Sequence, residues 1–300
     1  MMRKRMVFCF IPILLFAFSI LSFSQTPAPQ TAKKLKVFIS VDMEGISGVV
    51  AWEDTGEKGT DYGLFRRLMT EETNAAIEGA LEAGAAEIVV RDAHGSARNI
   101  LPDLLNPEAK LIREWSGGPL DMMEGIDKTF DAAIMIGYHA RAGTPDAILK
   151  HTISGTIFDM KLNGKAVPEA GLNAAIAAYF GVPVVLLAGD LAATQQAKEL
   201  MPEISTVAVK EGIGKAGKML HPTKSHALIK AATIEALKNL GRYKLYKLTS
   251  PVTMEITFTR EDLVVKPALY PGAKRTGDRS VAFTSNDFME VLKFYLVAAG

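Results

Sequence analysis

Short apolar runs rich in valine and isoleucine alternate along the chain with longer segments of helical period. The apolar runs of strand length occupy residues 35–41, 87–91, 110–113, 132–137, 182–188 and 206–209. Apolar residues at helical spacing predict helices over residues 64–83, 171–180, 192–200 and 223–240. Because this alternation is typical of βαβ units, we expect an α/β fold with a mostly parallel sheet flanked by helices.

The pattern changes toward the C-terminus. Residues 152–167 have the pattern of an extended hairpin with a turn at Asn163-Gly164. Residues 252–259 and 280–284 are strand-like, and residues 285–299 have a helical pattern. We therefore predict an α/β domain over residues 35–242 and a smaller α+β region over residues 243–300.

The N-terminus has the order of a secretion signal. A basic start at residues 3–5 precedes an uncharged apolar run over residues 6–23, and Ser22 and Ser24 give a small-x-small cleavage pattern. The run is short for a membrane span of ~20 residues. We therefore predict a signal peptide over residues 1–24, a disordered linker over residues 25–34 and export to the periplasm or beyond. The alternative is an uncleaved anchor, which is the only membrane association we expect.

Composition narrows the function classes. The chain has 300 residues, 48% hydrophobic and 22% charged, which excludes a wholly disordered protein. Its formal net charge of +1 provides no basic field for nucleic acid, so we expect no such partner. Cys9 is the only cysteine, which excludes an intramolecular disulfide and a cysteine-based zinc site. A metal site in this chain has to use histidine and carboxylate ligands.

Residues of this kind follow several predicted strands. In open α/β sheets, ligands bind beyond the carboxyl ends of the strands. The first strand runs into Asp42 and Glu44, the second into Asp92 and His94, and the strand at residues 132–137 is followed by His139. A further acid, Glu169, precedes a predicted helix. Each of these residues taken alone is also compatible with a loop cap or a structural role. The pattern leaves a metal site and a set of structural residues both open.

The charges of this set favour a pair of metal ions. Asp42, Glu44 and Glu169 together carry −3, so one divalent cation leaves −1 and two leave +1, which a bound hydroxide balances. Five ligands exceed the three or four of a single zinc site and suit two ions that share a bridging carboxylate. Imidazole with carboxylate favours zinc, with manganese and cobalt as alternatives.

Five motifs then occur in order: SVDMEGISG (40–48), DAHG (92–95), GYHARAGTP (137–145), EAGLNAA (169–175) and VPVVLLAGD (182–190). Together they resemble the D-aminopeptidases of peptidase family M55, over residues 36–210 with a weaker match beyond. The resemblance implies a dinuclear zinc aminopeptidase that holds two Zn²⁺ per chain and acts on short peptides with an N-terminal D-residue, such as D-Ala-D-Ala. By motif position, Asp42 would bridge the ions, and the remaining ligands would be Glu44, His94, His139 and Glu169.

The resemblance also implies a catalytic residue and an assembly. The catalytic histidine of the family follows the Thr-Pro of the third motif, and His151 is the histidine available there. The family forms a ring-like homodecamer around a channel, so we expect a homo-oligomer that filters peptides by size. The family archetype is cytoplasmic, whereas this chain carries a predicted export signal.

Our mechanistic hypothesis is that a metal-bound hydroxide attacks the peptide carbonyl while the substrate amine binds the second metal or a nearby carboxylate. His151 would stabilise the oxyanion or protonate the leaving amine. Asn173 and Arg141 are candidates for substrate binding because they lie close to the motifs in sequence. Asp92 would either orient a ligand imidazole or cap a loop.

Other interpretations of the sequence lead to different functions. Residues 212–217 (GIGKAG) match the dinucleotide fingerprint G-x-G-x-x-G, but no helix start and no acidic strand end follow, which favours a flexible loop. A metal-dependent phosphoesterase would need basic residues near the metals, for which Arg91, Arg98 and Arg141 are available. A non-enzymatic periplasmic peptide-binding protein would need no metal.

Overall fold

The computed structural model describes residues 2, 6 and 34–300. The predicted signal peptide and linker therefore lie outside the described residues, apart from Met2, Met6 and Lys34. Within the described part of the chain, no helix combines the length and apolar character needed to cross a membrane. The fold that follows is that of residues 34–300.

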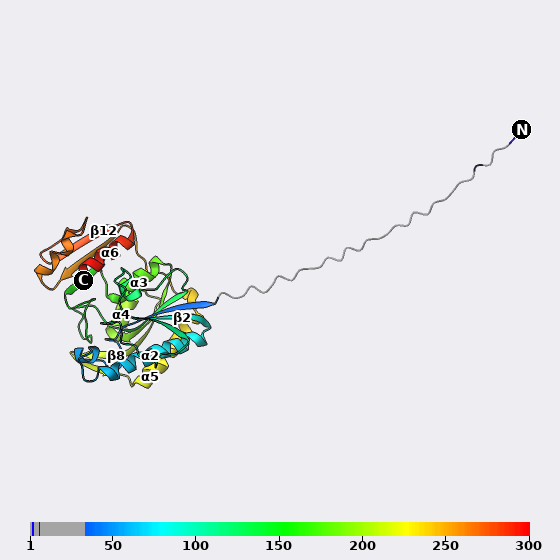
Figure 1. The fold of residues 1–300 in the computed structure, drawn as a ribbon, viewed down its shortest axis with the longest axis horizontal. Coiled ribbons are helices and arrows are strands. Elements are labelled where there is room, and N and C mark those ends of the chain that lie inside the picture. Colours follow the sequence, from blue (N-terminus) through cyan, green and yellow to red (C-terminus); the bar gives the residue numbers. More distant parts are fainter. Residues whose placement is uncertain (1, 3–5, 7–33) are drawn as a thin grey trace. The chain divides into compact units, whose positions relative to one another are not determined.

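A seven-stranded sheet forms the centre of the fold (Figure 1). Its strand order is β3-β2-β1-β4-β7-β8-β9, and all neighbours are parallel except β8 and β9. The strands are β1 (Leu35–Val41), β2 (Ala85–Asp92), β3 (Ala109–Ile112), β4 (Ala132–Tyr138), β7 (Val184–Asp190), β8 (Ser205–Ile213) and β9 (Ala216–Met219). Since β1 lies between β2 and β4, the carboxyl ends of these three strands meet at one edge of the sheet.

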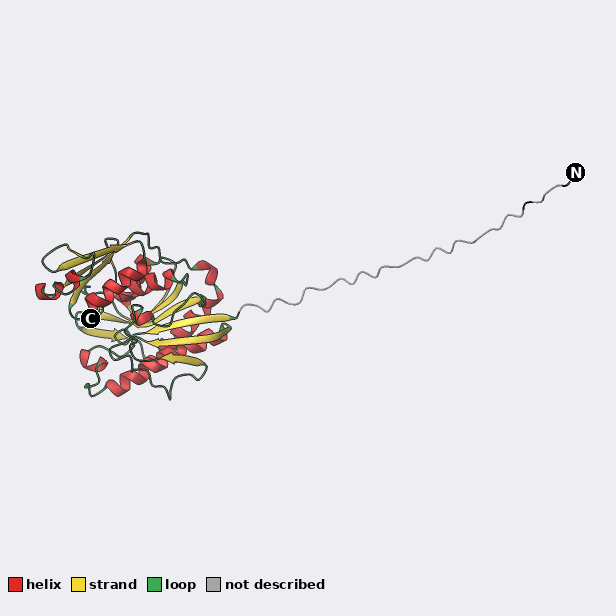
Figure 2. Cartoon of the chain, turned by 45° about the horizontal axis from the view of Figure 1, so that its top comes forward, coloured by secondary structure: helices red, strands yellow, loops and turns green. Residues whose placement is uncertain are grey.

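Helices cover both faces of this sheet (Figure 2). Side chains of successive strand residues point to opposite faces. In β1, Val37, Ile39 and Val41 pack into one core cluster with α2 and α5, whereas Phe38 packs into a second cluster with α3 and α4. The helices are α1 (Trp52–Thr55), α2 (Tyr62–Glu82), α3 (Glu169–Tyr179), α4 (Leu191–Leu200), α5 (Pro222–Lys238) and α6 (Phe288–Ala299).

A second, antiparallel sheet packs on the α3 side. Its order is β11-β12-β10-β5-β6, with β5 (Ile157–Leu162), β6 (Lys165–Ala166), β10 (Val252–Phe258), β11 (Lys274–Arg275) and β12 (Ser280–Ser285). Met160, Met254 and Ile256 of this sheet share the α3-side core cluster with Phe294 and Tyr295 of α6. Short 3-10 turns complete the chain at η1 (Asp121–Met123), η2 (Leu240–Arg242), η3 (Glu261–Val264) and η4 (Pro267–Leu269).

The predicted fold class, a mostly parallel α/β sheet flanked by helices with a smaller α+β element, is confirmed. The predicted hairpin is also present, with its turn at Asn163 and Gly164, but it forms β5 and β6 of the second sheet. That sheet therefore combines residues from both sides of the boundary predicted at residue 242, and the boundary itself stays a prediction.

The flexible loop expected at residues 212–217 is wrong, because this segment is the turn of the β8–β9 hairpin. A Cβ added at Gly212 would lie 2.2 Å from the carbonyl oxygen of Asp146, so another segment packs directly on this glycine. The glycines of the fingerprint therefore allow close packing within a β-hairpin. No helix begins there: the next one, α5, starts at Pro222.

Candidate metal centre

Acidic and imidazole side chains gather where β2, β1 and β4 end. Asp42 directly follows β1, His139 directly follows β4, and His94 lies two residues beyond β2. Glu169 is the first residue of α3. All five proposed ligands, Asp42, Glu44, His94, His139 and Glu169, thus lie at one edge of the sheet, as expected from the strand ends.

Glycines let the segments after β1 and β4 approach each other. The backbone N–H of Gly45 donates to the carbonyl oxygen of Gly137 at 2.7 Å. A Cβ at Gly45 would lie 2.1 Å from the carbonyl oxygen of Tyr138, and Gly137 has a φ of +73°. A side chain at Gly45 would therefore force apart the two segments that carry Glu44 and His139.

The Asp42 carboxylate lies between two imidazoles. Its Oδ1 is 3.2 Å from Nδ1 of His94, and its Oδ2 is 3.4 Å from Nε2 of His139. Nδ1 of His94 is also 2.9 Å from Oε2 of Glu44, and Nε2 of His139 is 3.2 Å from Oε2 of Glu169. The two oxygens of Asp42 thus face two separate sets of donors, which is the arrangement that a bridging carboxylate requires.

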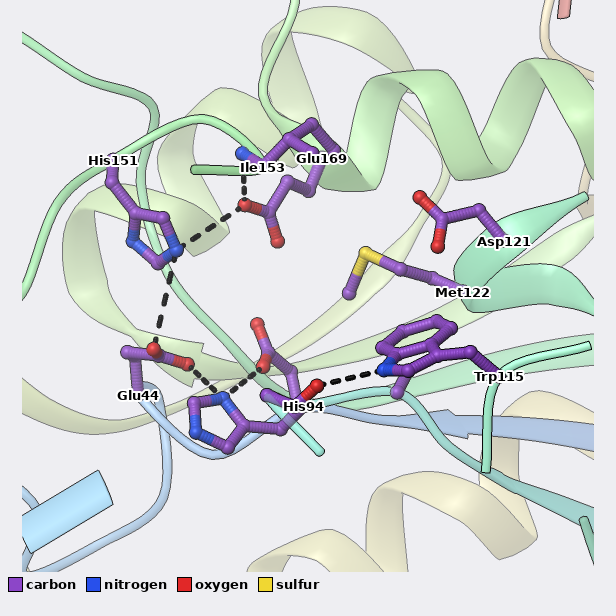
Figure 3. A pocket seen from close by; sticks show the side chains of 11 residues that line it. Glu44, His94, Trp115, Asp121, Met122, His151, Ile153 and Glu169 are labelled. Atoms are coloured by element: carbon purple, nitrogen blue, oxygen red, sulfur yellow. Dashed lines mark hydrogen bonds and ion pairs between the residues drawn. The ribbon is translucent and has the colours of Figure 1, made fainter. Parts of the chain in front are cut away.

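His151 completes the cluster from the loop after β4 (Figure 3). Its Nε2 lies 3.6 Å from Oε1 of Glu169 and 4.0 Å from Oε1 of Glu44. Its ring stacks on that of His139, with centroids 4.0 Å apart, and the edge of Trp52 packs against it. The structure therefore brings the predicted catalytic histidine to the same centre.

Each of the three imidazoles is oriented by a main-chain carbonyl. Nε2 of His94 lies 3.0 Å from the oxygen of Thr55, Nδ1 of His139 lies 3.0 Å from that of Ala140, and Nδ1 of His151 lies 2.9 Å from that of Leu149. Because a carbonyl oxygen only accepts, these nitrogens carry the hydrogen. The other ring nitrogen of each histidine then presents its lone pair to the carboxylates when the ring is neutral, as metal-ligating histidines do.

The centre needs positive charge. Burial, together with the neighbouring Glu44 carboxylate, raises the pKa of Asp42 to about 8. Burial opposes protonation of His139, but the Glu169 and Asp42 carboxylates prevail and raise its pKa to about 10. Bound protons therefore balance the carboxylates in the absence of another cation, and a metal ion would displace them.

The donor set fits divalent cations. Asp42 Oδ2, Glu44 Oε2 and His139 Nε2 are buried and have no hydrogen-bond partner among the described residues. Buried polar atoms are normally paired, and a cation between them would pair all three. Two sets of donor atoms, one from Asp42, Glu44 and His139 and the other from His139, His151 and Glu169, each lie within 4.8 Å of one another.

The ligand-bearing loop is fastened by a buried lysine. Nζ of Lys210, within β8, donates to the carbonyl oxygens of Glu44 at 2.5 Å, Ile46 at 2.9 Å and Val49 at 2.5 Å. Burial lowers the pKa of Lys210 to about 8. Glu72 of α2 adds a second attachment, because its Oε1 accepts the backbone N–H of Ser47 at 2.9 Å.

A cavity of about 240 Å³ opens onto the centre. Its lining consists of Asp42, Glu44, Ala93, His94, Gly95, Trp115, Asp121, Met122, His151, Ile153 and Glu169. This volume lies below the ~300–1,000 Å³ of typical small-molecule sites, so the cavity suits a small ligand.

Three other predicted residues lie away from this cavity. Asn173 is buried and donates to the Tyr138 hydroxyl at 2.8 Å, and Arg141 lines a different cavity beside α4. The positions of Asn173 and Arg141 do not support the substrate contact that we predicted. Both residues are close to the motifs in sequence, but their side chains do not line the cavity. Asp92 caps the loop after β2, accepting the backbone N–H groups of Asn99 and Ile100.

The arginines that a phosphoesterase would use are also directed elsewhere. Arg91 donates to the carbonyl oxygen of Glu114 at 2.6 Å and stacks on Trp115, and Arg98 is an exposed residue that pairs with Glu57. Neither they nor Arg141 line the cavity.

Sequence reasoning missed several residues of the site. Trp115, Asp121 and Met122 lie in an irregular segment that matches no motif. Lys210 did leave a signal, because it is a single lysine at the end of an apolar strand.

Taken together, a parallel α/β sheet and a buried set of carboxylates and imidazoles at its carboxyl edge define a metal-dependent hydrolase. The family model of the D-aminopeptidases, peptidase family M55, matches residues 35–297, and the chain belongs to this family. The predicted enzyme class, a metallo-aminopeptidase, is thereby confirmed.

Two comparisons with individual proteins agree. The chain is 37% identical over 269 residues to a D-aminopeptidase of Bacillus subtilis (strain 168), covering 88% of this chain and 96% of that protein. It also superimposes with a TM-score of 0.85, at 36% identity and with the same coverage, on a solved structure described as the Zn-dependent D-aminopeptidase DppA from Bacillus subtilis, a self-compartmentalizing protease.

Proposed function

We propose that this protein is a zinc-dependent aminopeptidase that removes an N-terminal D-residue from short peptides such as D-Ala-D-Ala, with two zinc ions per chain. The observation that carries the proposal is the convergence of imidazole lone pairs and unpaired carboxylate oxygens at the cavity floor. The similarity to a zinc-dependent D-aminopeptidase supports the choice of metal and of substrate stereochemistry.

The proposed ligands divide into two sets around Asp42. Oδ1 of Asp42, Glu44 and His94 would hold one ion, and Oδ2 of Asp42, His139 and Glu169 would hold the other. When bound, zinc polarises the peptide carbonyl and lowers the pKa of water.

His151 would move the proton. Its Nδ1–H donates to the Leu149 carbonyl, which leaves Nε2 free to exchange a proton beside Glu44 and Glu169. In this position His151 stabilises the developing oxyanion or protonates the leaving amine, which typically contributes ~10²–10⁴ in rate.

Metal analysis combined with peptide hydrolysis tests the proposal. We expect about two zinc ions per purified chain and faster hydrolysis of D-Ala-D-Ala than of L-Ala-L-Ala. Asp42→Ala should abolish turnover and lower the zinc content. A zinc-free chain that binds peptides without cleaving them would favour a peptide-binding protein, and undiminished turnover by Asp42→Ala would exclude the proposed centre.

Assembly and compartment are further parts of the proposal. The self-compartmentalizing relative supports a homo-oligomer, and we propose a decamer on family resemblance. Light scattering of the purified protein would measure the subunit number. We also propose export with removal of residues 1–24, which N-terminal sequencing of the periplasmic fraction would test.

A further inference from the structure

The wall of the cavity opposite the proposed ligands has its own chemistry. It consists of Trp115 together with Asp121 and Met122 of η1. Figure 3 shows Asp121 across the cavity from His151 and Glu44, with Met122 beside it. The proposed metal centre uses the other three carboxylates of the lining, whereas Asp121 belongs to neither set of ligands.

The Asp121 carboxyl is held in place by one hydrogen bond and has no ion-pair partner among the described residues. Its Oδ2 accepts a hydrogen bond from the hydroxyl of Tyr295, a fully buried residue of α6. Its Oδ1 has no hydrogen-bond partner among the described residues, and no described lysine, arginine or histidine forms an ion pair with it. A half-buried carboxylate with one oxygen fixed and the other open is suited to receive a cation.

Arg91, which lies beside Trp115, makes its contacts with residues other than Asp121. The Arg91 guanidinium donates to the Glu114 carbonyl and lies 4.5 Å from the centre of the Trp115 ring. It forms no ion pair with Asp121, and burial raises the pKa of the Asp121 carboxyl even though the Arg91 charge partly offsets this rise. The open Oδ1 of Asp121 is therefore available to a cationic group of a ligand.

The backbone at Asp121 is strained. Its φ of +51° places a non-glycine residue in the left-handed region, which non-glycine residues adopt uncommonly. Such strain persists where the surrounding structure imposes it, and it concentrates at binding and catalytic sites. Here the strained residue is the one whose carboxylate lines the cavity.

We propose that Asp121 binds the N-terminal ammonium of the substrate, so that it is the residue that makes the enzyme an aminopeptidase. This inference rests on the proposed function, because the first carbonyl of the peptide must reach the metal centre. An ammonium held at the opposite wall limits the reach of the substrate to its first peptide bond. A peptide without a free amine would leave the carboxylate unpaired and would bind weakly.

The test compares ligands that differ only in the amine. Zinc-loaded full-length protein and its Asp121→Asn, Asp121→Glu and Glu124→Gln variants are assayed with D-alanine p-nitroanilide and with propionyl p-nitroanilide, which lacks the amine. For Asp121→Asn we expect KM for the amine substrate to rise about 10- to 100-fold, with a smaller change in kcat and none for the propionyl compound. Asp121→Glu should recover part of the loss, and Glu124→Gln, a neighbouring carboxylate outside the cavity lining, should behave as wild type.

Calorimetric binding of D-alaninamide and propionamide separates this inference from the proposed function. We expect the wild type to prefer D-alaninamide and Asp121→Asn to lose that preference, with unchanged zinc content and melting temperature. If the wild type cleaves neither anilide yet shows this binding pattern, the proposed function fails and the assignment of Asp121 stands. Equal losses for both ligands, or an unchanged preference in Asp121→Asn, would overturn the assignment.

Discussion

The two walls of the cavity are built differently. The ligand wall, made of the proposed ligands Asp42, Glu44, His94, His139 and Glu169, lies at the ends of adjacent parallel strands, with Glu169 added from the start of α3. The strand backbones are hydrogen-bonded to each other up to Asp42, whose N–H donates to the carbonyl oxygen of Ile136. The opposite wall comes from an irregular segment whose Asp121 is held by Tyr295, 174 residues further along the chain. Under our two proposals, the ligand wall carries the chemistry and the opposite wall recognises the substrate.

Variants of the two walls should differ in the kinetic parameter that changes. Changes in the ligand wall should alter zinc content and kcat, whereas changes in the opposite wall should alter KM and leave zinc bound.

Replacing Asp42 by asparagine should have the largest effect. The change keeps the size of the side chain but removes the charge that faces both His94 and His139. Loss of metal chemistry is worth several kcal/mol, so we expect kcat/KM to fall about 1,000-fold or more. Elemental analysis should show reduced zinc, and full zinc content with normal turnover would refute the bridging role.

The His151→Gln variant should separate proton transfer from metal binding. We expect kcat to fall about 100-fold or more while the zinc content stays that of the wild type. Steady-state kinetics and metal analysis of the same sample provide both values. If zinc is lost as well, His151 is a ligand, as its position in a donor set with His139 and Glu169 would allow.

Removing the charge of Lys210 should lower the zinc affinity of the ligand wall, because this lysine holds the loop that carries Glu44. Lys210→Met leaves the three carbonyls of the Glu44 loop without their shared donor. Supporting contacts of this kind change metal affinity by about 10- to 100-fold, which competition with a zinc chelator would measure. Lys218→Met is the matched control, since that lysine is exposed and pairs with Glu211.

The buried Glu72 should make the free energy of unfolding depend on pH. Burial, partly offset by the hydrogen bond from Ser47 and by Lys210, raises the pKa of Glu72 from 4.5 to about 7. Because the folded state binds this proton more tightly, the contribution to stability is complete below pH 4.5 and is lost as the pH rises to about 7. Chemical unfolding should show a loss of up to about 3 kcal/mol between these limits. Glu72→Gln should abolish that part of the pH dependence, and an identical profile in the variant would contradict it.

The Tyr295→Phe variant should have the smallest effect on activity, and it tests the division between the two walls most directly. It removes the hydroxyl that holds Asp121. We expect a rise in KM of about 2- to 10-fold, with kcat and zinc content unchanged. A fall in kcat without a change in KM would place Tyr295 on the side of the chemistry and break the division between the walls.

The ligand wall could be predicted from the sequence because its residues follow strands that the apolar pattern already marks. Asp42, His94 and His139 each lie at or just beyond a strand end, and parallel pairing brings such ends together. The residues of the opposite wall have no such signal. Asp121 lies in a segment without periodicity, and its position depends on a partner in the last helix of the chain.

Two sequence-based interpretations, those of residues 212–217 and of Asn173, differ from the structure for local physical reasons. The glycines at 212–217 matched a phosphate-binding pattern, but Gly212 allows the Asp146 backbone, and Gly217 the Val50 side chain, to pack against the hairpin. Asn173 lies next to the ligand motifs in sequence, yet it sits in α3 and points to Tyr138 in the interior. Sequence distance from a motif does not determine which face of a helix a side chain occupies.

The carbonyl oxygens that orient the three imidazoles belong to the main chain at Thr55, Ala140 and Leu149. Every amino acid carries that oxygen, so no single substitution at these positions can delete the acceptor. The tautomers of the centre are thus encoded by the path of the backbone, and side chains affect them only by moving that path. Substitutions at residues 55, 140 and 149 that leave the backbone in place should therefore keep the same ring nitrogens of the three histidines directed at the carboxylates.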